Sequence, residues 1–84
     1  MHSDLQARIE HEVAELRGAY PRLTACHSAL RNWFEGGEPR YALWLDLRGV
    51  QHQSIVSGPA CDSLDEAVQA GFDKAREALG ASHA

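Results

Sequence analysis

The side chains best suited to chemistry are two cysteines and five histidines, and their spacing does not assemble a site. Cys26 and His27 are neighbours in the sequence. On a strand, however, successive side chains point to opposite faces, so these two cannot act together as a thiol nucleophile and its base. The sequence also has no glycine-rich phosphate loop and no Gly-x-Ser-x-Gly segment. We therefore expect a protein that is not an enzyme.

The cysteines and histidines also lack the spacing of metal ligands. Cys26 and Cys61 form no Cys-x-x-Cys motif, and we expect them to be reduced and packed as small apolar groups, the alternative being a single bridge. The histidines stand at positions 2, 11, 27, 52 and 83, with no pair four residues apart on a helical face. This pattern predicts neither a metal site nor a cofactor.

Length and composition indicate one small globular domain. A chain of 84 residues has room for a single core, so we expect one domain over residues 1–84 with an ordered core at about 4–80. The hydrophobic fraction is 44%, and no segment approaches the roughly 20 apolar residues that cross a bilayer. The first ten residues do not resemble a secretory signal. We expect a soluble cytoplasmic protein without a membrane partner.

Apolar residues spaced by three or four predict a first helix. They are Leu5, Ile9, Val13, Leu16 and Tyr20. Ser3 and Gln6 fit a capping box, which places the start near Asp4. Gly18 and Pro21 favour an end near Gly18 or Ala19.

The next segment alternates instead, as strands do. We expect a strand from Leu23 to Trp33, a hairpin loop over residues 34–39, and a second strand over residues 40–47. That second strand buries Tyr41, Leu43, Leu45 and Leu47 and leaves Trp44 on the wetter face. A third strand over residues 51–57 is closed by Gly58 and Pro59, and the short turns make all three antiparallel.

A second helix follows Ser63, which with Glu66 forms a capping box. Its apolar stripe consists of Leu64, Ala67, Val68, Gly71, Phe72, Ala75 and Leu79. Gly71 indicates a close approach of this helix to the sheet, and Gly80 should end it. The expected fold is α+β, a two-layer α-β-β-β-α arrangement with a three-stranded meander packed on two helices, the topology of double-stranded RNA-binding domains.

The order of these segments resembles the bacterial family of ribosome hibernation-promoting factors and ribosome-associated inhibitors. The resemblance runs from about Leu5 to Leu79 and is most specific in the last helix, which has Ala67, Val68, Phe72 and Lys74 in the family's order. Family members have an additional first strand, bind RNA in the small ribosomal subunit, and inhibit translation during stress. The resemblance therefore implies a ribosome-associated factor whose partner is ribosomal RNA and not DNA.

Basic side chains are the candidate RNA-binding residues. Arg31 and Lys74 match basic positions of the family, and Arg8, Arg17, Arg22 and Arg76 join them as cations able to gather into a patch. The alternative for each is a solvated surface charge in a weak ion pair.

The charge balance and the missing strand favour a second interpretation. Eight lysines and arginines against twelve acids give a formal net charge of −4, whereas RNA affinity rests on cations neutralising phosphates. The alternative is therefore a protein interaction module that keeps the fold without binding RNA. A homodimer through the exposed sheet edge belongs to this interpretation. Trp33, Phe34 and Trp44 would serve as core or dimer contacts, or else stack on bases.

Overall fold

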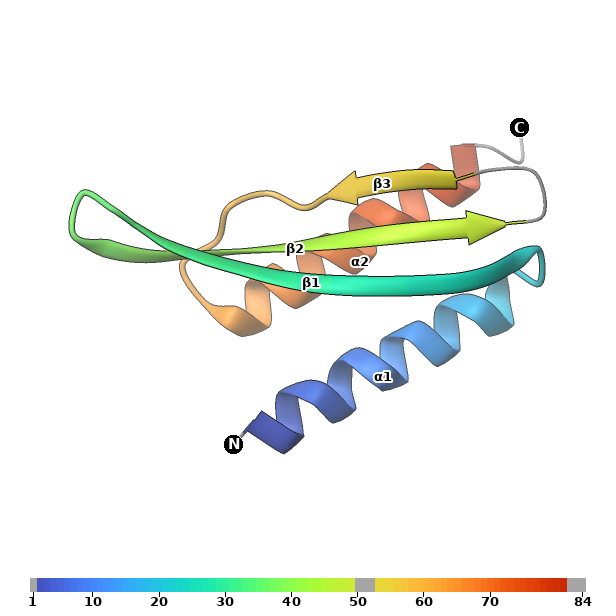
Figure 1. Ribbon diagram of the computed structural model, residues 1–84, viewed down its shortest axis with the longest axis horizontal. Helices are drawn as coiled ribbons and strands as arrows, with labels where there is room; N and C mark the ends of the chain where they lie inside the picture. The colour runs from blue at the N-terminus through green and yellow to red at the C-terminus, as the bar shows by residue number, and fades with distance from the viewer. Residues whose placement is uncertain (1, 50–52, 82–84) are drawn as a thin grey trace.

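The computed structural model describes residues 2–49 and 53–81. Along this part of the chain the elements are α1 (His2–Ala19), β1 (Leu23–Glu35), β2 (Glu38–Gly49), β3 (Gln53–Ser57) and α2 (Leu64–Ala81). The strands form one antiparallel sheet in the order β1-β2-β3, as Figure 1 shows. The expected α+β fold with an α-β-β-β-α order is confirmed. Neither of these helices has the length and apolar character needed to span a membrane.

The hydrophobic core lies between the sheet and the helices. Leu43, Leu45 and Leu47 alternate along β2 and are at most 3% exposed, as the sequence predicted. Cross-strand neighbours share a face of the sheet, which adds Val56 of β3, the partner of Leu45, to this side. β1 adds Leu23, and the helices contribute five further buried core residues: Leu16, Ala67, Val68, Phe72 and Ala75.

The two helices cover the sheet unequally. The backbone of α2 runs close to β2 and β3, whereas that of α1 runs close to β1 and α2. In Figure 1, α2 lies behind β2, while α1 lies beside β1 and extends past the edge of the sheet. Accordingly, Leu5, Ile9 and Val13 of α1 are only partly buried.

Two glycines allow α2 to approach the sheet closely. A Cβ atom on Gly71 would lie 2.7 Å from the Cβ atom of Leu43, and one on Gly58 would lie 2.9 Å from the Cα atom of Gly71. Real Cβ atoms do not approach other atoms this closely, so both positions require the absence of a side chain. The close approach predicted at Gly71 is confirmed.

The hairpin is tighter than the sequence indicated. The loop expected over residues 34–39 is wrong, because Phe34, Glu35, Glu38 and Pro39 are all paired in strands. Only Gly36 and Gly37 form the turn, with φ values of 61° and 82°. Two consecutive residues with positive φ match the twist of a hairpin, so two glycines suffice. The β1–β2 ribbon therefore projects past the helices at one end of the molecule (Figure 1).

Two helix boundaries also differ from expectation. α1 is already helical at His2, so the predicted start near Asp4 is wrong and Ser3 lies inside the helix. α2 continues through Gly80 to Ala81, because the glycine there keeps a helical backbone. The cap of α2 is confirmed, since the Glu66 amide donates to the Ser63 hydroxyl at 3.1 Å. The third strand begins at Gln53, and residues 51 and 52 lie outside the described residues.

Candidate binding surface

The face of the sheet opposite the helices is open. Its composition follows from the strand register, in which Ala29 pairs with Trp44 and Trp33 with Arg40. On the other side of β2, Ile55 pairs with Asp46. These side chains point away from Leu43 and Leu45, because neighbours along a strand alternate between faces. We call this surface the open face.

An apolar diagonal stripe crosses the open face. It runs from Trp33 on β1 through Ala42 and Trp44 on β2 to Ile55 on β3, and we define it by these four residues. Trp33 and Trp44 are each 38% exposed and Ile55 is 67% exposed. Ala42 is only 5% exposed and forms the floor between the two tryptophans. Clustered exposed apolar side chains of this kind mark interaction sites.

Charged side chains on the open face are held in local contacts. The guanidinium of Arg31 lies 4.7 Å from the centre of the Trp44 ring, which is a cation–π contact. Arg48 is 3.1 Å from Asp46, and Gln53 donates to the same carboxylate at 3.3 Å. Arg40 forms ion pairs with Glu35 and Asp62. The open face therefore combines fixed charges with exposed aromatic rings.

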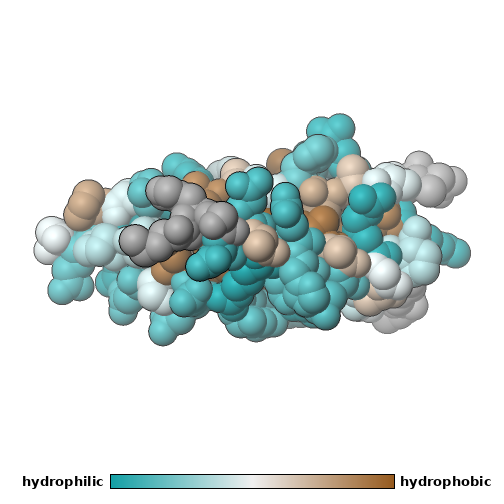
Figure 2. Space-filling model, turned by 90° about the horizontal axis from the view of Figure 1, so that it is seen from below, coloured by the Kyte–Doolittle hydropathy of each residue, from teal (hydrophilic) through white to brown (hydrophobic). Residues whose placement is uncertain are grey.

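Formal charge is divided unevenly between the two sides of the molecule. The open face carries Arg31, Arg40 and Arg48 against Glu35, Glu38 and Asp46, and is neutral. The helices and their connections therefore carry the whole net charge of −4. Their nine acids are Asp4, Glu10, Glu12, Glu15, Asp62, Asp65, Glu66, Asp73 and Glu77, and their five cations are Arg8, Arg17, Arg22, Lys74 and Arg76. The view from below, from the side on which α1 lies in Figure 1, is predominantly hydrophilic (Figure 2).

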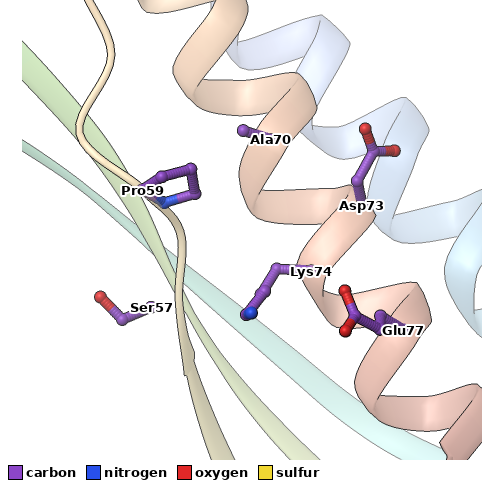
Figure 3. Close-up of a pocket in the computed structure, with 6 residues that line it drawn as sticks. All are labelled: Ser57, Pro59, Ala70, Asp73, Lys74 and Glu77. Carbon is purple, nitrogen blue, oxygen red and sulfur yellow. The ribbon is translucent and has the colours of Figure 1, made fainter.

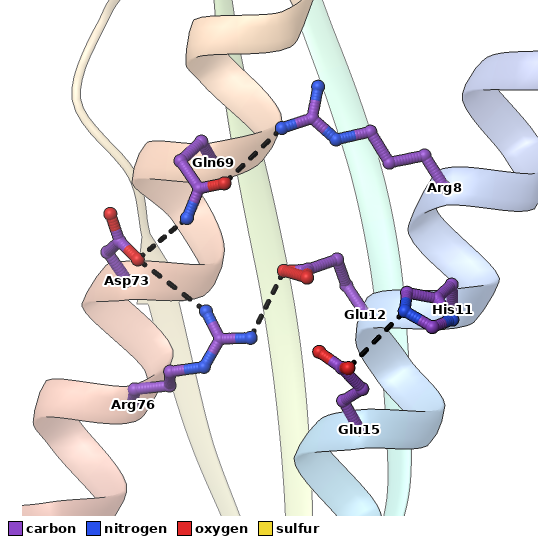
Figure 4. Close-up of polar contacts among 7 residues, drawn as sticks. All are labelled: Arg8, His11, Glu12, Glu15, Gln69, Asp73 and Arg76. Atoms are coloured by element: carbon purple, nitrogen blue, oxygen red, sulfur yellow. Dashed lines mark hydrogen bonds and ion pairs between the residues drawn. The ribbon is translucent and has the colours of Figure 1, made fainter.

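Two of the six candidate RNA-binding residues, one from each helix, lie in the seam between the helices (Figure 4). Arg8 of α1 lies 2.8 Å from Asp65 and also donates to Gln69 at 3.3 Å. Arg76 of α2 reaches back to Glu12 of α1 at 3.1 Å.

Both guanidinium groups therefore already face carboxylates of this chain. Arg76 has a second acid within its own helix, since Asp73 lies at 3.5 Å. A phosphate group approaching either arginine would have to compete with these carboxylates. The seam holds α1 against α2 by polar contacts, and it is not a free basic patch.

The other four candidates lie apart from this seam. Arg17 donates to the carbonyl oxygen of Thr24 at 3.3 Å, at the corner between α1 and β1, and Arg22 is exposed on the connection between them. Arg31 lies on the open face. Lys74 lines a shallow groove of about 490 Å³ between α2 and β3. Its ammonium points away from α2 toward Ser57, and Glu77 lies on the helix side of the groove (Figure 3). The structure does not join the six cations into one patch.

Both cysteines are free thiols. They are opposite Leu47 and Tyr41 of β2, roughly 20 Å apart along the strand, which is too far for a disulfide. Burial raises the pKa of Cys26 above its ordinary value, although Arg17 acts in the opposite direction. Burial also raises the pKa of Cys61, and the carboxylates of Glu66 and Asp62 add to this. Within residues 2–49 and 53–81, no three histidine, cysteine or acidic side chains gather as metal ligands would.

Comparison with known proteins adds no relative. No protein-family model matches the chain, and neither the curated proteins nor the solved structures contain a significant match.

The sequence predicted that Trp44 lies on the face away from the core, but it did not predict which residues lie beside it. Alternation along β2 placed Trp44 on the side away from the core. The convergence of Trp33 and Ile55 on Trp44 depends on the pairing register of three strands. No signal within a single strand contains that register, so the stripe was visible only in the structure.

Proposed function

We propose that this chain is a binding module without catalytic activity, that its binding surface is the open face, and that its partner is a protein. The observation that supports this most is the diagonal stripe on a neutral face, beside a helical side that carries the net charge of −4. Interface centres are enriched in aromatic residues and depleted of free charge. The stripe has this composition.

The distribution of cations supports a protein partner over an RNA partner. Affinity for RNA grows with the number of phosphates that lysines and arginines neutralise. Arg8, Arg40 and Arg76 contact carboxylates of this chain, and Arg31 lies on a tryptophan ring. A polyanion approaching the helical side would also meet nine acids. A protein partner that contacts Trp33, Trp44 and Ile55 needs no free cations and does not approach the acids of the helical side.

Affinity chromatography with matched variants tests the proposal. The chain is immobilised as wild type, as Trp44→Ala and as Phe34→Ala, and is exposed to nuclease-treated lysate. Phe34 is the control, because it is an aromatic residue that is 76% exposed but lies on the helix side of the hairpin tip. We expect the same protein to be retained by the wild type and by Phe34→Ala, and lost from Trp44→Ala. Retention unaffected by Trp44→Ala would overturn the proposal, as would strong salt-dependent RNA binding.

The second candidate function is a ribosome-associated factor that binds the small subunit. It is favoured by the resemblance along the sequence, whose α-β-β-β-α elements the fold contains, and by the Arg31–Trp44 contact. Aromatic and arginine side chains on an open sheet are also how single-stranded RNA modules stack bases.

Co-sedimentation distinguishes this candidate from the first. Small ribosomal subunits from stationary-phase cells are pelleted at low and at high salt in the presence of the chain. A factor that binds through RNA phosphates pellets at low salt. It is released as salt rises, because salt cations then replace its lysines and arginines at the phosphates. A chain that stays in the supernatant at low salt rules the ribosomal function out.

A further inference from the structure

We propose that the partner of the open face is a second copy of this chain, and that the two copies stack sheet against sheet. This inference rests on the proposed function, because it identifies the protein partner of that surface. The resulting dimer would have a four-layer order of helices, sheet, sheet and helices. The helical sides would face outward into solvent.

Charge favours this orientation over other contacts between copies. Each copy carries a net charge of −4, so two copies that approach through their helical sides repel each other. The open face is the side that carries no net formal charge. Two copies can therefore approach through it without this repulsion.

Because of the strand register, the stripe of one copy is complementary to the stripe of a second copy that runs in the opposite direction. Along β2, Ala42 and Trp44 occupy successive positions on the open face, with Arg31 opposite Ala42 and Asp46 next beyond Trp44. A two-fold axis that crosses the stripe between Ala42 and Trp44 seats each Trp44 over the partner's Ala42. The same axis brings each Arg31 toward the partner's Asp46. A large side chain thus meets a small one, and a cation meets an acid.

The available area is adequate for a dimer of moderate affinity. The molecule is a slab of 41 × 25 × 15 Å, and the open face belongs to one of its broad sides. A fully buried aromatic side chain removes roughly 150–250 Å² from water, and both tryptophans still expose more than a third of theirs. With Ile55 they supply part of the roughly 800 Å² per partner of a standard interface, and the flanking residues of this broad side would supply the rest.

The position of α1 argues against the other dimer geometry, in which the β1 edges pair. Paired strands lie about 4.8 Å apart, whereas packed helices need about 8–10 Å between their axes. Because α1 already extends past β1 (Figure 1), an antiparallel pair of β1 edges would force the two α1 helices into the same space. The opposite edge is short, since β3 has five residues and is followed by Pro59.

Sedimentation equilibrium of the full chain from micromolar to millimolar concentration tests the proposal. We expect a reversible dimer that Trp44→Ala weakens by at least about tenfold, as truncation of a central aromatic residue does. Phe34→Ala should leave the dissociation constant unchanged. Ile55→Lys provides a second disruptive variant, because a side chain that is 67% exposed can be replaced without unfolding the monomer. Circular dichroism verifies that each variant is folded.

A charge exchange tests the orientation of the two copies. Arg31→Glu should weaken the dimer, and adding Asp46→Arg in the same chain should restore most of the affinity, since the cation and the acid then exchange places. Small-angle scattering distinguishes the compact stacked dimer from a longer edge-paired one.

Each of the remaining outcomes overturns the inference. A wild type that is monomeric up to millimolar concentration overturns the second copy as partner, while retention of another protein by the open face would still support the proposed function. A dimer that Trp44→Ala and Ile55→Lys leave intact places the contact elsewhere. Salt-dependent binding of a single-stranded oligonucleotide to the open face of a chain that stays monomeric overturns both.

Discussion

The two faces of the sheet are built from the same strands and differ in almost every physical property. On the helix side, β2 presents Leu43 and Leu45, both 0% exposed. On the open face, the residue between them is Trp44, which is 38% exposed. The first face is closed by α2 so tightly that Gly71 can have no side chain. In a domain this small, one helix layer completes one core and leaves the second apolar surface exposed.

The largest effect should come from the closed face. Phe72 of α2 is fully buried. Phe72→Ala should destabilise the domain by about 3–5 kcal/mol, because it removes buried apolar surface and also leaves a cavity. Urea denaturation followed by circular dichroism measures the change. Phe34→Ala removes an equal ring from an exposed position and should cost less than about 0.5 kcal/mol. Similar losses for the two variants would mean that the core is not where we place it.

Gly71→Ala probes how closely α2 approaches the sheet. Alanine favours a helix by about 1 kcal/mol over glycine. Here, however, the added methyl group would overlap Leu43, and overpacking costs about 1–3 kcal/mol. We expect a net loss of stability in thermal or urea unfolding. Gly80→Ala is the matched control in the same helix, with no atom within 4 Å of its added Cβ, and should stabilise slightly. A Gly71→Ala protein as stable as the wild type would contradict the close approach.

A smaller effect is expected in the polar seam between the helices. The Glu12 side chain is 15% exposed and contacts Arg76, so Glu12→Gln should cost about 1 kcal/mol. High salt should reduce the difference from the wild type. Glu15→Gln is the control, because Glu15 is 56% exposed and pairs only with His11 when that imidazole is protonated. Equal effects for the two substitutions would show that the seam adds nothing beyond surface pairing.

The smallest effect should come from the open face of the monomer. Ile55→Ala in dilute solution should change the free energy of unfolding by less than about 0.5 kcal/mol, since the side chain is 67% exposed. At high protein concentration the difference should grow, because the proposed dimer would stabilise the wild type more than the variant. Thermal melts at two protein concentrations measure both values. A large loss in dilute solution would mean that the open face supports the monomer itself.

Features that depend on the periodicity of apolar residues within one helix or strand could be predicted from the sequence. Alternation predicted the buried leucines of β2, and the three-to-four spacing predicted the buried face of α2, because each pattern is local. The hairpin was predicted too long, since two glycines with positive φ need no further loop residues and Phe34 can pair in a strand.

Features that join distant residues were not accessible in this way. The charge division between the two sides and the diagonal stripe arise only after three strands are aligned. The Arg31–Trp44 contact joins β1 to β2, and the Arg76–Glu12 contact joins the two ends of the chain. The candidate RNA-binding cations were chosen by residue type and by the resemblance, whereas the carboxylate partners of Arg8 and Arg76 are set by packing. The sequence alone contains no measure of that packing.

The tight turn at Gly36 and Gly37 also bears on how the chain folds. It brings β1 and β2 together through contacts between residues close in sequence, and such local contacts speed folding. An isolated two-stranded hairpin is only marginally stable in water, so the ribbon needs α2 to persist. We therefore expect the hairpin to form early and the docking of Gly71 onto Leu43 to complete the transition. Substitutions at Gly36 or Gly37 should then slow refolding, whereas Gly71→Ala should mainly accelerate unfolding.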